Sequence, residues 1–389
     1  MPENKKDTIW TGRFLLVILL TLFSGAAGQM TYPLVAKFSL TLNPDITLAS
    51  TIAGLMSLMS LFVCPFAGLL SDRVSRKRIL QISSICYGIV LIMHAFVKNI
   101  PMLIALRLLV GVFFSINGVT SIAFSTSFIP ESRIGEGLGY AALANILAQA
   151  VGPAIGLKLV EISGYPATFF CAGLSAFFCF VVITLLPYKE PEKKPAASKS
   201  IKLENLVAVE FIGFMLLAAL FSSGNGMITT YLAIIAEERA IPNIALFFTL
   251  YSVCMVVLRP FTGRLLDKKG AYFILVPAVL FAALGMVLVG IGYSLSAMLV
   301  ASVFKALGQG AGVPSLQASV IKKLDKSRAG VATSTIQIGQ NIGNALAPMA
   351  GSFFVKSFGY EKMFCGFAAF LAVCGLLILY LQYRKEQRA

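Results

Sequence analysis

The stretch GLLSDRVSRKR at residues 68–78 is repeated in altered form as GRLLDKKG at residues 263–270, 195 residues further along the chain. The same offset relates other glycine, proline and charged positions of the two halves. An offset that holds across several loops indicates an internal duplication, which fixes the architecture of a chain. The equivalent positions include Pro65 and Pro260, Ser132-Arg133 and Ser327-Arg328, Pro153 and Pro348, Gly156 and Gly351, and Gly164-Tyr165 and Gly359-Tyr360.

The composition excludes most classes of soluble protein. Of the 389 residues, 58% are hydrophobic and 13% are charged, and the mean hydropathy is +0.85. Soluble domains carry about 25% charged residues, so a soluble globular enzyme, a disordered chain and a fibrous protein are excluded. The seven cysteines lack a CxxC pattern and paired spacing, which excludes a disulfide scaffold and a zinc module.

Long apolar blocks predict membrane spans. A bilayer core about 30 Å thick is crossed by about 20 apolar residues in a helix. We therefore predict an all-α integral membrane protein with twelve transmembrane helices in two six-helix bundles related by the parallel repeat. The bundles are expected at residues 1–187 and 206–389, with a cytoplasmic linker at 188–205. The predicted spans lie near residues 13–36, 48–70, 79–97, 101–123, 136–159, 166–187, 206–231, 242–263, 272–293, 296–319, 329–354 and 361–382.

The distribution of basic residues predicts the orientation. With twelve spans, 23 of the 32 Lys and Arg residues lie on the side that holds both termini, 6 lie on the other side and 3 lie within spans. Cytoplasmic loops are enriched in Lys and Arg, so we expect both termini to be cytoplasmic, in a bacterial inner membrane. The net charge of +15 is spread over many loops, whereas a nucleic-acid surface concentrates it on one face, so no nucleic-acid partner is expected.

The repeated loop resembles a signature of the major facilitator superfamily, GxLaDrxGrkxxL, with Ser75 where glycine is usual. The resemblance implies the twelve-helix fold of that family. An aspartate at a helix end beside Arg or Lys can latch neighbouring helices by a charge-assisted hydrogen bond. Breaking that latch could shift the balance between two conformations, so we predict a gating role. The gating residues are Gly68, Asp72, Arg73, Arg76 and Lys77, and in the second half Gly263, Asp267, Lys268 and Gly270.

Arg107 begins the sequence RLLVG, which is similar to the RxxqG signature of the same family, with Val110 in place of the usual glutamine. An ionisable side chain inside a span costs at least about 2.5–3.5 kcal/mol and is a functional candidate for that reason. The alternative is that Arg107 reaches the outer membrane surface with its charged end.

The segment GPAIG at residues 152–156 resembles the GPxxGG signature of the antiporter (efflux) branch, with Leu157 in place of the last glycine. This resemblance implies export. The alternative is that Gly152, Pro153 and Gly156 serve close helix packing and a bend in the helix.

Polar side chains within spans face the bundle interior or a water-filled cavity. In the family that the motifs resemble, the first and fourth helices of each half line the cavity and the second and fifth flank it. For the amides of the spans at 136–159 and 329–354, hydrogen bonding between helices without ligand contact is an equal alternative. The predicted cavity residues are Gln29, Tyr32, Asn117, Asn145, Gln149, Asn225, Lys305, Gln309, Gln340, Asn341 and Asn344.

No Asp or Glu lies in the middle of a predicted span. Glu136 begins one span and Glu210 lies one turn inside another, and with Arg107 and Lys305 they are the charged candidates for proton coupling. Lys305 lies about 12 Å deep at the helical rise of 1.5 Å per residue. It could exchange a proton, or it could be the counter-ion of a substrate carboxylate or phosphate.

These features predict a secondary transporter that works by alternating access, with proton-coupled efflux of small amphipathic or drug-like compounds. The alternative is an organic-anion transporter, an exchanger or facilitator, with Lys305 and Arg107 as counter-ions. The sequence shows no nucleophile–base constellation, metal cluster or phosphate loop, so we expect no enzymatic activity, metal or cofactor. The expected partners are a small-molecule substrate, protons and the lipid bilayer, with the protein as a monomer.

Overall fold

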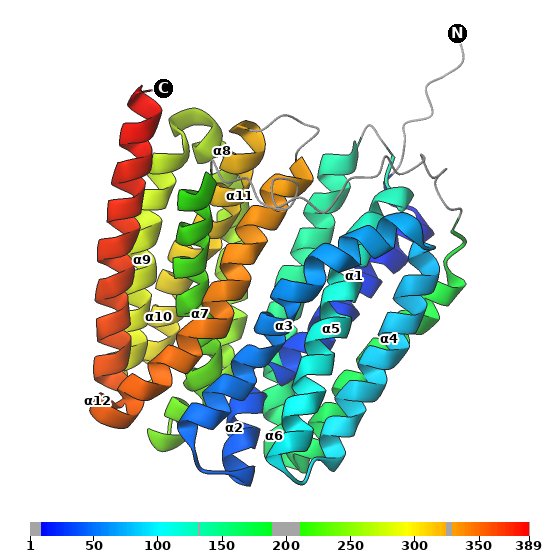
Figure 1. Cartoon of the computed structure of the whole chain (residues 1–389), viewed down its shortest axis with the longest axis horizontal. Helices are drawn as coiled ribbons and strands as arrows, with labels where there is room; N and C mark the ends of the chain where they lie inside the picture. The colour runs from blue at the N-terminus through cyan, green and yellow to red at the C-terminus, as the bar shows by residue number, and fades with distance from the viewer. Residues whose placement is uncertain (1–8, 131–132, 189–210, 324–328, 389) are drawn as a thin grey trace.

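The computed structural model describes residues 9–130, 133–188, 211–323 and 329–388, and within these ranges the chain forms helices and turns without a strand (Figure 1). The all-α prediction is therefore confirmed for the described chain. In the first half the helices are α1 (Gly12–Thr31), α2 (Leu34–Leu42), α3 (Ile46–Arg73), α4 (Arg76–Met93), α5 (Ile100–Ser125) and α6 (Ile134–Leu185). In the second half they are α7 (Ile212–Glu238), α8 (Ala245–Lys269), α9 (Ala271–Ile291), α10 (Leu295–Lys305), the π-helix η6 (Ala306–Gly310), α11 (Ala311–Lys323) and α12 (Ala329–Arg388).

Ten helical segments in the described part of the chain are long and apolar enough to cross a membrane. Two of them are much longer than one crossing, and each contains a glycine with non-helical dihedrals, Gly164 in α6 (φ 78°) and Gly359 in α12 (φ 76°). A positive φ is easily adopted by glycine alone, so the helix can change direction there. Figure 1 shows α12 running back past its bend towards the end of the molecule where it begins. Two of the twelve predicted spans fall within each of these helices.

Short polar residues mark the starts of several helices. The Asp45 carboxylate accepts a hydrogen bond from the Thr47 backbone N–H at 2.8 Å at the start of α3. The Asn99 side chain accepts one from Met102 at 3.0 Å at the start of α5. Such caps satisfy backbone N–H groups that have no partner within the helix. They therefore favour a helix start at Ile46 for α3 and at Ile100 for α5.

The helices pack in two sets. In the first set α1 packs against α6, and α4 packs against α5 and α6; in the second, α7 and α9 pack against α12. The sets meet where α3 packs against α12 and α6 against α8. Figure 1 shows the sets side by side, with the start of α1 and the end of α12 at the same end of the molecule, which we call the terminal end. Of the predicted linker at 188–205, only Tyr188 lies within the described residues.

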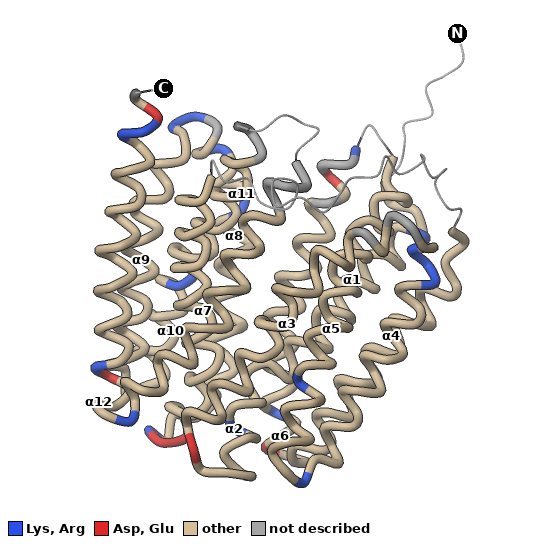
Figure 2. Tube along the Cα trace, in the orientation of Figure 1, with Lys and Arg blue, Asp and Glu red and all other residues tan. Residues whose placement is uncertain are grey.

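The two sets are joined at the end opposite the terminal end. Lys37 of α2 pairs with Glu237 of α7 at 3.1 Å, and Lys356 of α12 pairs with Asp45 beside α3 at 2.8 Å. Gly54 of α3 lies so close to α12 that an added β-carbon would be 2.5 Å from the Ala345 carbonyl oxygen. Figure 2 shows that charged residues gather mainly at the two ends of the helices, which leaves a middle with few of them among the described residues.

Candidate functional site

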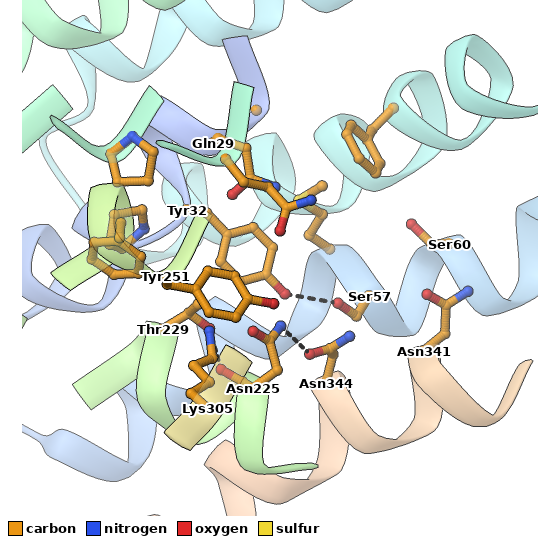
Figure 3. A pocket seen from close by; sticks show the side chains of 17 residues that line it. Gln29, Tyr32, Ser57, Ser60, Asn225, Thr229, Tyr251, Lys305, Asn341 and Asn344 are labelled. Carbon is orange, nitrogen blue, oxygen red and sulfur yellow. Dashed lines mark hydrogen bonds between the residues drawn. The ribbon is translucent and has the colours of Figure 1, made fainter. Parts of the chain in front are cut away.

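A cavity of about 180 Å³ lies between the two sets of helices. We call it the central cavity; its lining comes from α1, α3, α5 and α6 of the first set and α7, α8, α10 and α12 of the second. Figure 3 shows the polar side chains around it converging from both sets. Seven of the predicted contact residues line it: Gln29, Tyr32, Gln149, Asn225, Lys305, Asn341 and Asn344.

A second cavity of about 240 Å³ adjoins the first and shares Gln29, Phe114 and Gln149 with it. The predicted residue Asn145 lines this second cavity. Its wall reaches Ser125, the last residue of α5, so the cavity extends from the centre towards the terminal end of the molecule. The second cavity and the end at which the ion pairs join the two sets therefore lie on opposite sides of the central cavity, and we call the joined end the closed end.

Lys305 is the charged side chain of the central cavity. It is 4% exposed, and its Nζ lies 4.0 Å from the centre of the Tyr251 ring and 5.9 Å from that of Phe247. An ammonium over an aromatic face is attracted to the ring electrons. Within the described ranges no carboxylate forms an ion pair with Lys305, and no Asp or Glu lines either cavity.

Hydrogen bonds hold the neighbouring polar side chains in place. The Asn225 Nδ2 donates to the Asn344 Oδ1 at 3.0 Å, which links α7 to α12 (Figure 3). The Tyr32 and Ser57 hydroxyls lie 3.2 Å apart and link α1 to α3. The Thr229 hydroxyl donates to the Asn225 carbonyl at 2.8 Å. These bonds lie within one set or the other, so they fix each wall of the cavity separately.

Three predicted contact residues lie outside both linings. Asn117 points to α4, where its Oδ1 accepts hydrogen bonds from Ser83 and Ser84 at 3.0 and 3.1 Å. Gln309 lies in η6 and lines neither cavity, and its buried Oε1 has no hydrogen-bond partner among the described residues. Gln340 of α12 is also absent from the linings, whereas Gln337, Asn341 and Asn344 share a face that meets the cavities.

The remaining charged candidates also lie away from the cavities. Arg107 is 1% exposed and lines neither cavity, and its Nη2 donates to the Ala53 carbonyl at 3.4 Å. Its Nε and Nη1 have no hydrogen-bond partner among the described residues. The exposed Glu136 pairs with Arg133 at 3.6 Å. Glu210 lies outside the described residues.

The basic residues of the gating motif contact the ends of neighbouring helices. Arg76 donates to the Ala123 carbonyl near the end of α5 at 3.0 Å, and Lys77 donates to the Thr184 and Leu186 carbonyls at the end of α6. Cations are favourable at these helix ends, whose carbonyls carry partial negative charge. Gly68 and Gly263 have open space around them, Lys268 is exposed, and Gly270 ends α8 with a φ of 80°. The side chains of Asp72, Arg73 and Asp267 lie outside the described part of the chain.

The efflux motif lies where α6 crosses α1. A β-carbon at Gly152 would be 2.6 Å from the Gln29 Cβ, and one at Gly156 would overlap the Met30 carbonyl oxygen. Pro153 lines the central cavity. The motif therefore provides the close helix approach that its small residues allow, directly behind Gln29.

Several lining residues were not among the predicted contacts. Ser57 and Ser60 lie one turn apart on α3, and the aromatic residues Phe114, Phe248 and Tyr251 complete the walls. Their residue types are common on helix faces that pack together, so the sequence did not separate them from the core. The clustering of Phe247, Phe248 and Tyr251 on α8 is the signal that could have pointed to a partner for Lys305.

Comparison with known proteins places this geometry in a family. The sequence model of the family described as Major Facilitator Superfamily matches residues 17–242 and 214–389 of this chain. Multidrug resistance protein MdtG of Proteus mirabilis is 25% identical over 410 residues, covering 100% of both chains. MdtG of Escherichia fergusonii is 26% identical and covers 93% of each chain.

Solved structures share the fold at low sequence identity. A mutant of the nucleoside transporter NupG superposes with a TM-score of 0.79 at 14% identity, over 95% of this chain and 99% of that one. An inward-facing, unoccupied bacterial homologue of the human lysosomal transporter Spinster gives a TM-score of 0.75 at 14% identity, over 95% and 96%. With the family match over both halves, these findings show that the chain belongs to the major facilitator superfamily, as a multi-pass membrane protein and secondary transporter rather than an enzyme.

Proposed function

We propose that the protein exports small amphipathic compounds from a bacterial cell by alternating access, driven by inward movement of protons. The observation that carries the proposal is a cavity between two sets of helices that is closed at one end and continues towards the other. In this proposal the chain crosses the inner membrane twelve times, since α6 and α12 each cross twice. Its bundles are residues 1–187 and 206–389, its linker is 188–205, and its termini are cytoplasmic.

Alternating access requires contacts between the two sets of helices that can break and form again. The two ion pairs at the closed end are partly exposed, and pairs of this kind contribute little and break at low cost. Rocking one set against the other would separate them and open the cavity to the outside. Hydrogen bonds within each set, such as Asn225 to Asn344, would survive that movement.

The cavity walls suit an amphipathic cargo. Aromatic and apolar side chains, including Phe114, Phe248 and Met56, alternate with amides and hydroxyls. Such mixed linings bury an apolar body and orient a few polar groups. The full-length similarity to proteins named for multidrug resistance supports export, as does the efflux motif at residues 152–156.

The residues that line the cavity narrow the choice of the side chain that carries the proton. Lys305 is the charged member of the described lining, so we propose it as the proton-linked group there. Glu210 is the other candidate. If neither Lys305 nor Glu210 couples transport to proton movement, the protein would be an exchanger or a facilitator.

Transport in proteoliposomes tests the proposal. Protein is reconstituted, and protein-dependent uptake of ethidium and anilinonaphthalenesulfonate is measured in vesicles with an acidic or an equilibrated lumen. An acidic lumen should accelerate the uptake of at least one dye by the protein molecules that are inserted inside-out. Nigericin, which collapses the pH difference, should abolish the acceleration. Protein-dependent uptake that ignores the pH difference would contradict proton coupling. The absence of protein-dependent flux for both dyes would contradict export of amphipathic compounds.

A further inference from the structure

We propose that Lys305 binds an oxyanion head group of the cargo, so that the preferred substrates are amphipathic organic anions such as carboxylates. This inference rests on the proposed export function and specifies its substrate class. It is carried by a buried ammonium that faces a cavity without a carboxylate among its described walls.

The position of Lys305 in its helix is specialised. It is the last residue of α10 and is followed at once by η6, a π-helical turn of five residues. Single π-turns of this kind occur frequently at functional sites because they re-aim the side chains around them. Gly285 of α9 lies behind the Lys305 backbone, where a β-carbon would be 3.0 Å from the Lys305 nitrogen. The backbone at Lys305 is thus held closely from behind while its side chain reaches the cavity.

The charge of Lys305 is incompletely compensated by its surroundings. The Tyr251 ring at 4.0 Å stabilises the ammonium but supplies no hydrogen-bond acceptor in its face. A buried charge is costly unless it is paired and hydrogen-bonded. Arg107, the other deeply buried cation, lines neither cavity. An anion that enters the central cavity would therefore meet a single positive charge that has no carboxylate partner among the described residues.

The neighbours of Lys305 can complete an anion site. Because the Asn344 Oδ1 accepts from Asn225, the Asn344 amide keeps its N–H groups for another acceptor. Asn344 and Lys305 both line the central cavity (Figure 3). An oxyanion could receive a charge-assisted hydrogen bond from Lys305 and a neutral one from Asn344. The apolar body would lie against Phe114, Phe248 and Met56.

The same arrangement disfavours cationic cargo. A cation in the central cavity would approach the Lys305 ammonium at close range, and no described lining residue offers a carboxylate to offset the repulsion. Like charges that face each other across an interface exclude wrong partners. The site thus discriminates by the sign of the head-group charge.

Three probes with the same apolar body test this inference: naphthylacetate, naphthylethanol and naphthylethylammonium. Their dissociation constants are measured on the purified full-length protein by isothermal titration at pH 7. The wild-type protein should bind the carboxylate at least about tenfold more tightly than the alcohol or the ammonium compound, a difference that corresponds to about 1.4 kcal/mol. Lys305→Gln should remove this preference while leaving the affinity for the alcohol within about twofold. Lys305→Arg should retain the preference, and Lys158→Gln, which removes an exposed lysine of α6, should change nothing.

Equal affinities for the three probes in the wild-type protein would overturn the inference, as would no binding of the carboxylate or a preference that survives in Lys305→Gln. Retained binding of the alcohol shows that the variant is folded. The dye transport measurement is independent of this result. Head-group preference without pH-driven uptake would contradict the proposed export and leave the anion site standing, whereas pH-driven uptake with no preference would contradict the anion site alone.

Discussion

At the scale of single residues, Gly156 sets how closely α1 and α6 approach. A β-carbon there would overlap the Met30 carbonyl oxygen, which belongs to backbone and cannot rotate away. We expect Gly156→Ala to destabilise the protein by about 1–3 kcal/mol, as overpacking does in other cores. The displaced α1 would also move Gln29, so affinity for naphthylacetate should fall. Thermal unfolding in detergent and the same titration measure both effects.

Gly139 provides the matched control for Gly156 in the same helix. A β-carbon at Gly139 would have no heavy atom within 4 Å. Alanine is the better helix former, so Gly139→Ala should leave the melting temperature unchanged or raise it slightly. If both variants unfold at the wild-type temperature, the glycine motif is not a close-packing device.

At this scale the predicted cavity residues divide into those that line a cavity and those that do not. The sequence predicted both Lys305 and Gln309 as cavity residues of one span, and Lys305 lies in the cavity lining. Gln309 does not, and it lies in the π-turn that begins at Ala306, where the α-helical spacing of 3.6 residues does not hold. Asn117 also lies outside both linings: two serine hydroxyls of α4 donate to its side chain, and no periodicity reveals such a partner.

At the scale of elements, the Asp45–Lys356 pair connects the α3 start to α12 across the two sets of helices. The hydrogen bond from Lys356 holds the pKa of the Asp45 carboxyl below its usual value, and the Thr47 backbone N–H lowers it further. Because this pKa is lower in the closed form, the pair favours closure above the usual aspartate pKa of about 3.9. That contribution is lost as the pH falls through the lowered value. Changes in external pH between about 5 and 8 should therefore leave the pair intact.

We expect Asp45→Asn to raise the population of open conformations at this end by about two- to fivefold at neutral pH, since asparagine keeps the helix cap but loses the charge of a pair worth up to about 1 kcal/mol. Pulsed electron paramagnetic resonance between spin labels at the exposed positions 41 and 362 measures the change, in a background without native cysteines. The variant should populate longer distances at pH 7, and the wild-type protein should do so only below about pH 4. Glu161→Gln removes a more exposed pair within α6 and should leave the distances unchanged. Identical distance distributions in Asp45→Asn and wild type would show that the pair does not hold the closed end.

The gating motif predicts where helices end and begin, but not which helices its side chains contact. The sequence identified residues 68–78 as a basic turn between two spans, and α3 ends and α4 begins within it. It did not predict that Arg76 and Lys77 would bind carbonyls at the ends of α5 and α6, because those partners lie 47 to 109 residues away. Spacing along the chain identifies a helix end, whereas its partner depends on the packing of the whole set.

At the scale of the whole molecule, the duplication was the most informative feature of the sequence. The offset of 195 residues equates Gly164 with Gly359, and both have a positive φ at the bends of α6 and α12. Equivalent packing follows, since α1 packs against α6 as α7 packs against α12. The duplication does not specify the cavity, because cavity function differs between the halves. Lys305 aligns with Val110, so the charge of the site belongs to one half alone.

From the positions of the closed end and the two cavities we predict the side of the membrane from which the second cavity is accessible. With cytoplasmic termini, the second cavity should admit reagents from the cytoplasm, and Ser121 of α5 lines it. In a cysteine-free background, Ser121→Cys should react with a membrane-impermeant maleimide in everted vesicles and about tenfold more slowly in right-side-out vesicles. Lys268→Cys and Lys98→Cys, at exposed positions on the proposed inner and outer sides, calibrate the two preparations. Faster labelling of Ser121→Cys from the outside would mean that the cavity opens to the exterior, and the orientation derived from the basic loops would be wrong.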